Sequence, residues 1–351
     1  MSPRRAIVAG LVAAASTAAA SPPAAFPPTP APDGGGVPGQ VWRAMAAGFD
    51  RASAEREPPP RPPVPVPVTW KARRVASLDL GAPLLAMTAG DLDGAGLAEL
   101  VALTERHVVV LRPAGRGLGE VARTALPAAP APMRPRDAVG AVAIAARPGG
   151  GGDVLARAST AGQGARYRLD GKVLREVGAH DGFPLCAGAS DELVPGRNYF
   201  GPAPAPLFSR RCREDLIDAH GRAMRVEATV AVGGRLTVVL ETRCKPGEAA
   251  CLARREVVRD TVGVAIEVDD VDRDGVPEVI ISGAGAPGDA DAVAVLTVGA
   301  TGFPKKPVFR RAFSGGVAAL CSGDVDGDGD RDVFAAVRLA GARKVDLWLL
   351  D

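Results

Sequence analysis

The sequence predicts an all-β fold, a β-propeller of about five blades in which an N-terminal strand closes the ring. Two observations carry this prediction. From about residue 68 onward, short runs of β-branched and aliphatic residues alternate with Gly, Asp and Pro, and no long amphipathic helix interrupts them. An acidic loop between two apolar runs then recurs at a spacing that suits a blade of several short strands.

The predicted strands are short and follow one another closely. Typical runs are RHVVVLR, ATVAVGGRLTVVLET, AVAVLTV and KVDLWLL. The segments LDGK at 169–172 and VGGR at 232–235 predict tight hairpin turns, because Asp-Gly and Gly-Gly accept the positive φ that such turns need. Strands joined in this way form antiparallel sheets.

Three acidic loops align and define the repeat. They are GDLDGAGLAELVAL from Gly90, DDVDRDGVPEVIIS from Asp269 and GDVDGDGDRDVFAA from Gly323. The last acids of the second and third loops, Glu278 and Asp332, lie 54 residues apart, and the same step from Glu99 reaches Asp153. Asp215 then divides the interval from Asp153 to Glu278 into steps of 62 and 63 residues. About five repeats result.

The last repeat lacks a strand. It contains only three predicted strands before Asp351. The segment TWKARRVASLDL, which precedes the first repeat, is a spare strand of the right kind, and its pairing with the last blade would close the ring and cover the sheet edges. The repeat does not place the residues at 190–212, so six or seven blades remain an alternative.

The N-terminal part of the chain is predicted to lie outside the propeller. Residues 1–20 combine an arginine pair, an apolar run and a small-residue triplet in the order of a secretory signal peptide. Residues 21–67 are rich in Pro, Ala and Gly and are expected to form a linker, with a short helix around 40–55. The propeller is expected over 68–351.

Charge and cysteine content bear on partners and compartment. The 42 basic and 40 acidic residues nearly balance, which argues against a nucleic-acid partner, and no transmembrane segment is expected in the mature chain. An exported chain, whether periplasmic, cell-surface or secreted, can form disulfides. Cys244 and Cys251 flank a turn-rich segment and form the first predicted pair. Cys186 with Cys212 forms the second, and Cys321 is expected to stay a buried thiol.

The acidic loops have the spacing of a calcium site. In DVDRDGVPE, carboxylates stand at positions 1, 3, 5 and 9, a glycine at position 6, and a backbone carbonyl is available at position 7. Calcium favours such a set, since it takes about six to eight oxygen ligands in flexible geometry. The predicted ligands are Asp270, Asp272, Asp274, Val276 and Glu278 in one loop, and Asp324, Asp326, Asp328, Asp330 and Asp332 in another. In the first loop Ala95 replaces the third carboxylate, so Asp91, Asp93 and Glu99 form a weaker third site.

An EF-hand is excluded by the residues around the loops. It needs an acid at position 12 and a helix on each side, whereas position 12 is Ile281 in one loop and Ala335 in the other, and the flanks are strand-like. A metal-free Asp-Gly hairpin turn remains the alternative for each loop.

The repeats resemble the FG-GAP/VCBS family, calcium-binding propeller repeats that are also found in integrin α-subunits. The resemblance rests on DVDRDGVPEVIISGAGAP at 270–287, GDVDGDGDRDVFAAV from Gly323 and GDLDGAGLAELVAL from Gly90. It implies a propeller that binds Ca²⁺ at two sites, with a weaker third, through the residues named above.

The sequence shows no catalytic motif. A Gly-x-Ser-x-Gly elbow, a phosphate-binding loop and a His-Glu-x-x-His motif are all absent, and His107, His180 and His220 are scattered. The chain is therefore predicted to be an exported, non-catalytic calcium-binding propeller that acts in recognition, adhesion or scaffolding of protein or glycan. The alternative is an extracellular enzyme of the polysaccharide lyase or quinone-dependent oxidoreductase type. The segment at 192–206 is either a binding loop or a crossing between blades.

Overall fold

The structure is a computed structural model that describes ten segments of one compact unit, Pro59–Asp351. The described residues are 61–115, 117–127, 138–180, 182–184, 209–231, 233–244, 254–284, 289–299, 302–339 and 343–351. The predicted signal peptide, most of the predicted linker with its helix, and the segment at 192–206 lie outside them.

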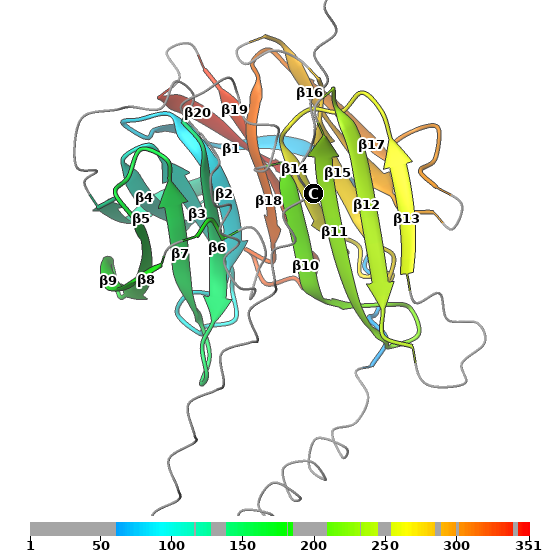
Figure 1. Ribbon diagram of the computed structural model, residues 1–351, viewed down its shortest axis with the longest axis horizontal. Helices are drawn as coiled ribbons and strands as arrows, with labels where there is room; N and C mark the ends of the chain where they lie inside the picture. Colours follow the sequence, from blue (N-terminus) through cyan, green and yellow to red (C-terminus); the bar gives the residue numbers. More distant parts are fainter. Residues whose placement is uncertain are drawn as a thin grey trace, which may run out of the picture. The chain divides into compact units, whose positions relative to one another are not determined.

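Twenty β-strands form five four-stranded antiparallel sheets, the blades of a propeller (Figure 1). Blade 1 consists of β2 (Leu84–Gly90), β3 (Glu99–Thr104), β4 (His107–Ala114) and β5 (Gly117–Ala125). Blade 2 consists of β6 (Gly140–Ala146), β7 (Gly152–Ala158), β8 (Gly164–Asp170) and β9 (Val173–His180). Blade 3 consists of β10 (Arg210–Ile217), β11 (Ala223–Ala231), β12 (Arg235–Thr242) and β13 (Arg254–Arg259). Blade 4 consists of β14 (Ile266–Asp269), β15 (Glu278–Ser282), β16 (Asp291–Thr297) and β17 (Phe309–Phe313). Blade 5 consists of β18 (Val317–Gly323), β19 (Asp332–Arg338), β20 (Lys344–Leu350) and β1 (Ala72–Asp79). The described residues contain no helix.

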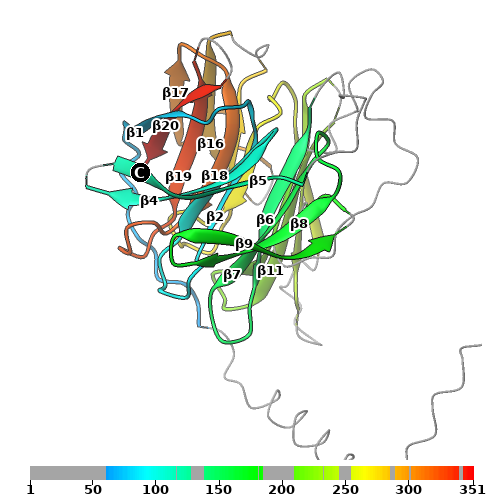
Figure 2. The same ribbon diagram turned by 90° about the vertical axis from the view of Figure 1, so that its left-hand side faces the viewer.

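The last blade is completed by the N-terminal strand, as the sequence predicts. Strand β1 pairs antiparallel with β20 from Ala72 opposite Leu350 to Asp79 opposite Lys344. Both views show blue β1 beside dark red β20 (Figures 1 and 2). Strand β1 is thereby the outermost strand of blade 5, and it covers the edge of β20 that would otherwise be unpaired.

The second strands of the blades differ in burial. The second strands of blades 1 and 4, β3 and β15, are buried along their whole length, since neighbouring blades cover both of their faces. Both strands accordingly contain a continuous aliphatic run, which a glutamate precedes and a hydroxyl residue follows. Strand β11 is instead half covered, and its residues alternate between buried and partly exposed.

Among the described residues, apolar clusters join four of the five pairs of neighbouring blades. Four clusters span blades 1 and 2, 3 and 4, 4 and 5, and 5 and 1. Members from the two blades of each include Leu103 with Tyr167, Leu240 with Ile281, Val295 with Leu320, and Phe334 with Leu100. Burial between sheets is therefore the main force that holds the ring together.

One element of the predicted repeat is wrong. Asp153, Glu278 and Asp332 lie at the start of the second strand of their blades, but Asp215 lies on β10, the first strand of blade 3. In blade 3 the two strands are joined by the short loop 218–222, which lacks the acidic pattern, so the acid nearest to the expected spacing was not the equivalent one. The count of five blades is nevertheless confirmed.

Candidate metal centres

The three acidic loops occupy the same place in three blades. Each joins the first strand of its blade to the second: 91–98 in blade 1, 270–277 in blade 4 and 324–331 in blade 5. The loops are also bonded to one another. Ala98 N donates to Asp324 O at 2.7 Å, and Arg331 N donates to Val271 O at 3.2 Å. The three loops therefore form a continuous row at one end of the ring.

Each loop is folded by its own carboxylates. The acid at position 9 accepts a hydrogen bond from the backbone N–H of position 2 in all three, at 2.7 Å in blade 1 and 3.1 Å in blades 4 and 5. The acid at position 1 accepts from the backbone N–H of position 4, of position 6 or of both. Gly275 at position 6 needs its glycine, because its φ is +83° and a Cβ would meet Ala219 N at 2.2 Å.

The structure brings three carboxylates together in each loop. The clusters, whose ligand oxygens lie within 4.8 Å of one another, are Asp91, Asp93 and Glu99; Asp270, Asp272 and Glu278; and Asp324, Asp326 and Asp328. Each of these clusters could hold a metal ion. The remaining predicted carboxylates lie in the same loops: Asp274 Oδ1 accepts from Val276 N at 2.7 Å, and Asp332 Oδ2 accepts from Val325 N. Coordination by the carbonyls of Val276 and Asp330 stays a prediction.

The loop of blade 4 contains buried carboxyl groups that have no basic partner among the described residues. Asp270 is only 7% exposed, and its Oδ1 is buried with no hydrogen-bond partner. Burial, together with the nearby carboxylates Asp274 and Asp272, raises the pKa of Asp270 to about 6. Burial and the same neighbours raise the pKa of Glu278 to about 9. Among the described residues, no basic side chain forms an ion pair with the acids of this loop.

Blade 5 repeats this arrangement. Asp330 and Asp332 are both buried. Burial raises the pKa of each to about 7, and Asp328 adds to the shift of both. In the part of the chain that the structure describes, these acids too lack a basic ion-pair partner. A divalent cation would supply the missing positive charge in both loops.

The first three blades instead contain arginines that the sequence analysis missed. In blade 1, Arg112 Nε donates to Glu99 Oε1 at 2.7 Å, and its Nη2 donates to Asp93. In blade 2, Asp153 is fully buried and accepts from Arg166 Nε at 2.8 Å and Arg168 Nε at 2.9 Å. Blade 3 has an ion pair between Arg222 and Asp218 at 2.7 Å in its short loop. In blades 1 and 2 the available signal was an arginine on the strand that follows the acid, whereas in blade 3 the arginine lies in the same loop as Asp218.

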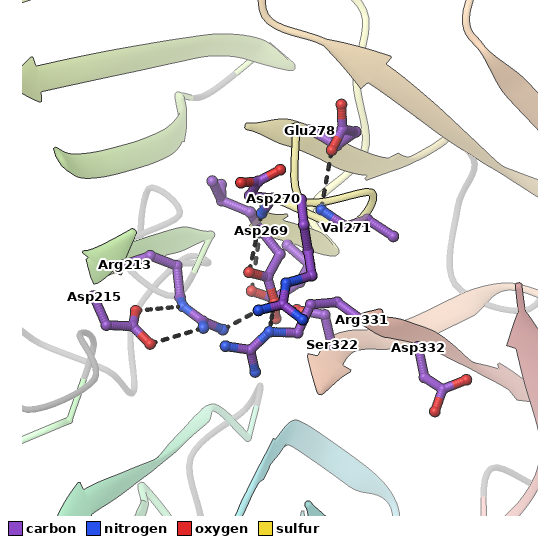
Figure 3. A network of polar contacts seen from close by, with 12 residues as sticks. Arg213, Asp215, Asp269, Asp270, Val271, Glu278, Ser322, Arg331 and Asp332 are labelled. Atoms are coloured by element: carbon purple, nitrogen blue, oxygen red, sulfur yellow. Dashed lines mark hydrogen bonds and ion pairs between the residues drawn. The ribbon is translucent and has the colours of Figure 1, made fainter. Parts of the chain in front are cut away.

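A second polar network lies beside the loops of blades 4 and 5 (Figure 3). Asp269, which is fully buried at the end of β14, accepts from Arg213 Nη1 of β10 at 3.1 Å and from Ser322 Oγ of β18 at 2.7 Å. Arg331 Nε lies 3.9 Å from the same carboxylate oxygen. Arg213 also holds Asp215 through two hydrogen bonds of 2.9 and 3.0 Å. The network therefore links the first strands of blades 3, 4 and 5.

A cavity of about 330 Å³ opens next to this network. Its lining includes a residue from the first strand of every blade, namely Thr88, Ala143, Arg211, Glu267 and Ser322. Arg211 Nε lies 3.5 Å from Glu267 Oε2, and burial raises the pKa of Glu267. The first strands thus surround a central channel, as in a propeller.

The sheet topology assigns the fold, and comparisons with known proteins add no family to it. The chain is a five-bladed β-propeller. No protein-family model matches it, and no curated protein matches it. Among solved structures it is similar to the WD40 domain of SCAP from fission yeast, with 11% identity and a TM-score of 0.28, over 75% of this chain and 70% of that chain. The propeller assignment rests on the sheet topology and not on this likeness.

The cysteines, histidines and helices complete the comparison with the sequence. Cys212 and Cys244 are disulfide-bonded, and Cys321 is a buried free thiol. Cys186 and Cys251, their predicted partners, lie outside the described residues. The three histidines belong to three different blades. Within the described residues, no helix is long and apolar enough to cross a membrane.

Proposed function

We propose that this chain is an exported, non-catalytic β-propeller of the FG-GAP/VCBS type that binds Ca²⁺ in the loops of blades 4 and 5 and presents one face of the ring for recognition of protein or glycan. The observation that carries the proposal is the buried Oδ1 of Asp270, which has no partner. Asp270 forms a cluster with two more carboxylates. Without a cation, this buried oxygen would lose its hydration with no interaction to offset the free-energy cost.

The donor set suits calcium better than a smaller or softer ion. All side-chain donors in the two loops are carboxylate oxygens, and the described part of each cluster contains no Cys or His. Mg²⁺ would demand near-octahedral geometry and would keep several waters, whereas Ca²⁺ accepts irregular sets of oxygens. Asp270, Asp272 and Glu278 would hold the ion in blade 4, and Asp324, Asp326 and Asp328 would hold it in blade 5.

Recognition is proposed at the end of the ring where the loops lie. The central cavity reaches the same end, because Asp91 and Arg331 of the loops line it together with the strand residues. Cations in blades 4 and 5 would fix the loops around this opening. The two disulfide-bonded cysteines support export, since disulfides persist in oxidising compartments.

Thermal unfolding with added Ca²⁺, with added Mg²⁺ and with a chelator tests the metal. Ca²⁺ at a hundred times its dissociation constant should stabilise the chain by roughly 2.7 kcal/mol for each site, and Mg²⁺ should do so less. Asp272→Ala and Asp326→Ala should each remove part of this gain, and together they should remove most of it. Arg74→Ala, which lies on β1, serves as a control and should keep the whole gain.

A melting temperature that is the same in calcium and in chelator would refute the calcium assignment. Recognition is tested separately by probing arrays of glycans and extracellular proteins with the wild-type chain and with Arg331→Ala. A ligand whose binding is weakened by Arg331→Ala supports recognition at the channel opening. Ligand binding that is equally strong in the wild type and in Arg331→Ala, with and without calcium, would show that the recognition surface lies elsewhere.

A further inference from the structure

The residue that faces the last acid of each loop differs between blades. This residue lies on the third strand, directly across the sheet. In blade 2 the register pairs Asp153 with Arg168. In blade 1 it pairs Leu100 with Leu111, which brings Glu99 to Arg112 one step further along. Two blades therefore place an arginine at this cross-strand position.

The other two acidic blades lack that arginine. In blade 4 the register pairs Glu278 with Thr297. In blade 5 the register pairs Val333 with Leu350. One step further along, Asp351 lies opposite Asp332, the acid at position 9. The same position across the sheet is thus cationic in blades 1 and 2, neutral in blade 4 and acidic in blade 5.

The arginine in blade 1 lies where a metal ion would bind. Its Nε donates to Glu99 Oε1 at 2.7 Å and its Nη2 donates to Asp93, so a single guanidinium bridges positions 3 and 9 of the loop. Those carboxylates belong to the cluster that could hold a metal, and Glu99 is almost fully buried. A guanidinium is a planar, permanently charged fork that matches carboxylates well. Here the chain itself supplies the cation.

We propose that the residue at this cross-strand position selects the counter-ion of each blade: Arg112 closes the acidic loop of blade 1 to metal ions, whereas Thr297 and Asp351 leave the loops of blades 4 and 5 to them. This inference rests on the proposed function, because it assumes that the latter two loops bind Ca²⁺. It goes further in naming the residue that excludes a third ion from the loop of blade 1.

The physical basis is competition for the same oxygens. Glu99 Oε1 and Asp93 Oδ2 already accept charge-assisted hydrogen bonds from Arg112. A calcium ion on these atoms would have to displace the guanidinium, and two cations held a few ångströms apart would repel each other. The closed loop of blade 1 nevertheless keeps the fold of the calcium-type loops, because the arginine offsets the same negative charge.

Reciprocal substitutions test the inference, with Ca²⁺ binding to the purified full-length chain measured by titration calorimetry. Thr297→Arg should lower the number of bound calcium ions from two to one. Space for the longer side chain exists, since Thr297 lines a cavity of about 490 Å³ beside Val276 and Pro277. The melting temperature in chelator should rise, because the new guanidinium replaces the missing cation. Thr297→Val adds no charge and should keep both sites.

The opposite substitutions should create a calcium site in the loop of blade 1. Arg112→Thr gives it the residue of blade 4, and Ala95→Asp supplies the carboxylate that blade 1 lacks at position 5. The double variant Ala95→Asp, Arg112→Thr should bind three calcium ions. Ala95→Asp alone, which keeps the guanidinium in place, should still bind two.

The outcomes separate the inference from the proposed function. Two ions in the wild type, with unchanged numbers in both Thr297→Arg and the double variant, would overturn the inference and leave the proposed function standing. Three ions in the wild type would do the same. No bound calcium in the wild type would overturn both. If Thr297→Arg does not fold, Asp351→Arg at the end of blade 5 replaces it, and it should likewise lower the number from two to one.

Discussion

Buried carboxylates dominate the molecule at the scale of single residues. Burial raises the pKa of Asp270 to about 6, of Asp332 to about 7 and of Glu278 to about 9. Without a cation these groups therefore bind protons in the folded state that the unfolded chain has released at the same pH. Protons and the proposed calcium ions would compete for one set of oxygens, so both are expected to control the stability of the two loops.

The raised pKa values predict how stability depends on pH in metal-free buffer. The stability contributed by each of these protonated carboxyls is fully present below its unfolded pKa of about 4 and is lost as pH rises through its folded pKa. The metal-free chain should therefore melt at a lower temperature at about pH 9 than at about pH 5. Added Ca²⁺ should remove most of that difference. Melting temperatures of the wild type and of Glu278→Gln, which has no titrating carboxyl at position 278, are measured across this pH range. An equal dependence of the melting temperature on pH in both chains would contradict the raised pKa of Glu278.

At the scale of elements, strand β1 decides whether the ring is closed. It covers the edge of β20 over the register from Ala72 to Asp79. The residues just before it are anchored as well: the ring of Trp70 stacks on Phe309 of blade 4 at 5.7 Å, and Val66 N donates to Asp272 O at 2.7 Å. The strand that completes blade 5 is thus held by blade 4 too, through one of the candidate metal loops.

Removal of β1 should open the propeller. A chain that starts at Leu80 would leave the backbone of β20 exposed at a sheet edge, which is a template for pairing with another chain. We expect this variant to associate or aggregate, as measured by size-exclusion chromatography with light scattering. A chain that starts at Arg61 keeps β1 together with Val66 and Trp70 and should keep the association state of the parent. Equal behaviour of the two truncated chains would show that closure by β1 is dispensable.

At the scale of the whole molecule, the network around Asp269 couples three blades. The carboxylate is fully buried at the end of β14, Arg213 reaches it from β10 and Ser322 from β18. Asp270, the next residue, belongs to a candidate metal loop, and its N–H donates to Asp269 Oδ1 at 3.0 Å (Figure 3). Arg331 and Asp332 are neighbours in the same way in blade 5. The candidate metal loops and the channel network are therefore built on adjacent residues.

Breaking this network should destabilise the ring as a unit. Arg213→Met removes the nearer arginine of the buried Asp269 carboxylate and leaves Arg331 Nε, at 3.9 Å. Removal of one partner of a buried ion pair costs about 3 to 5 kcal/mol. Asp269→Asn should cost less, because Arg213 keeps its bidentate contact with Asp215. In the double variant the two costs should not add, since both remove the same contact. Additive free energies of unfolding in a denaturant titration would show that the two residues do not act together.

Much of the fold and part of the site could be predicted from the amino-acid pattern alone. The spacing of the acidic loops implied about five blades, and the apolar pattern of TWKARRVASLDL indicated the closing strand. Asp270, Asp272 and Glu278 were found because a loop is local, so the spacing of its carboxylates along the chain already determines which oxygens meet. The failure at Asp215 has a related cause: a shorter loop in blade 3 breaks the spacing on which the repeat was measured.

The sequence by itself determined the strands, the repeat and the composition of the acidic loops, whereas the tertiary structure alone decided how each loop is neutralised. Arg112 lies 13 residues from Glu99, and Arg213 lies 56 residues from Asp269. Which pairs meet depends on strand register and on the packing of one blade against the next, and a shift of one residue would turn each side chain to the other face of its sheet. For that reason the loops look alike in the sequence, while in the structure an arginine of β4 binds the acids of the blade 1 loop and, among the described residues, no arginine forms an ion pair with the acids of the loops 270–277 and 324–331.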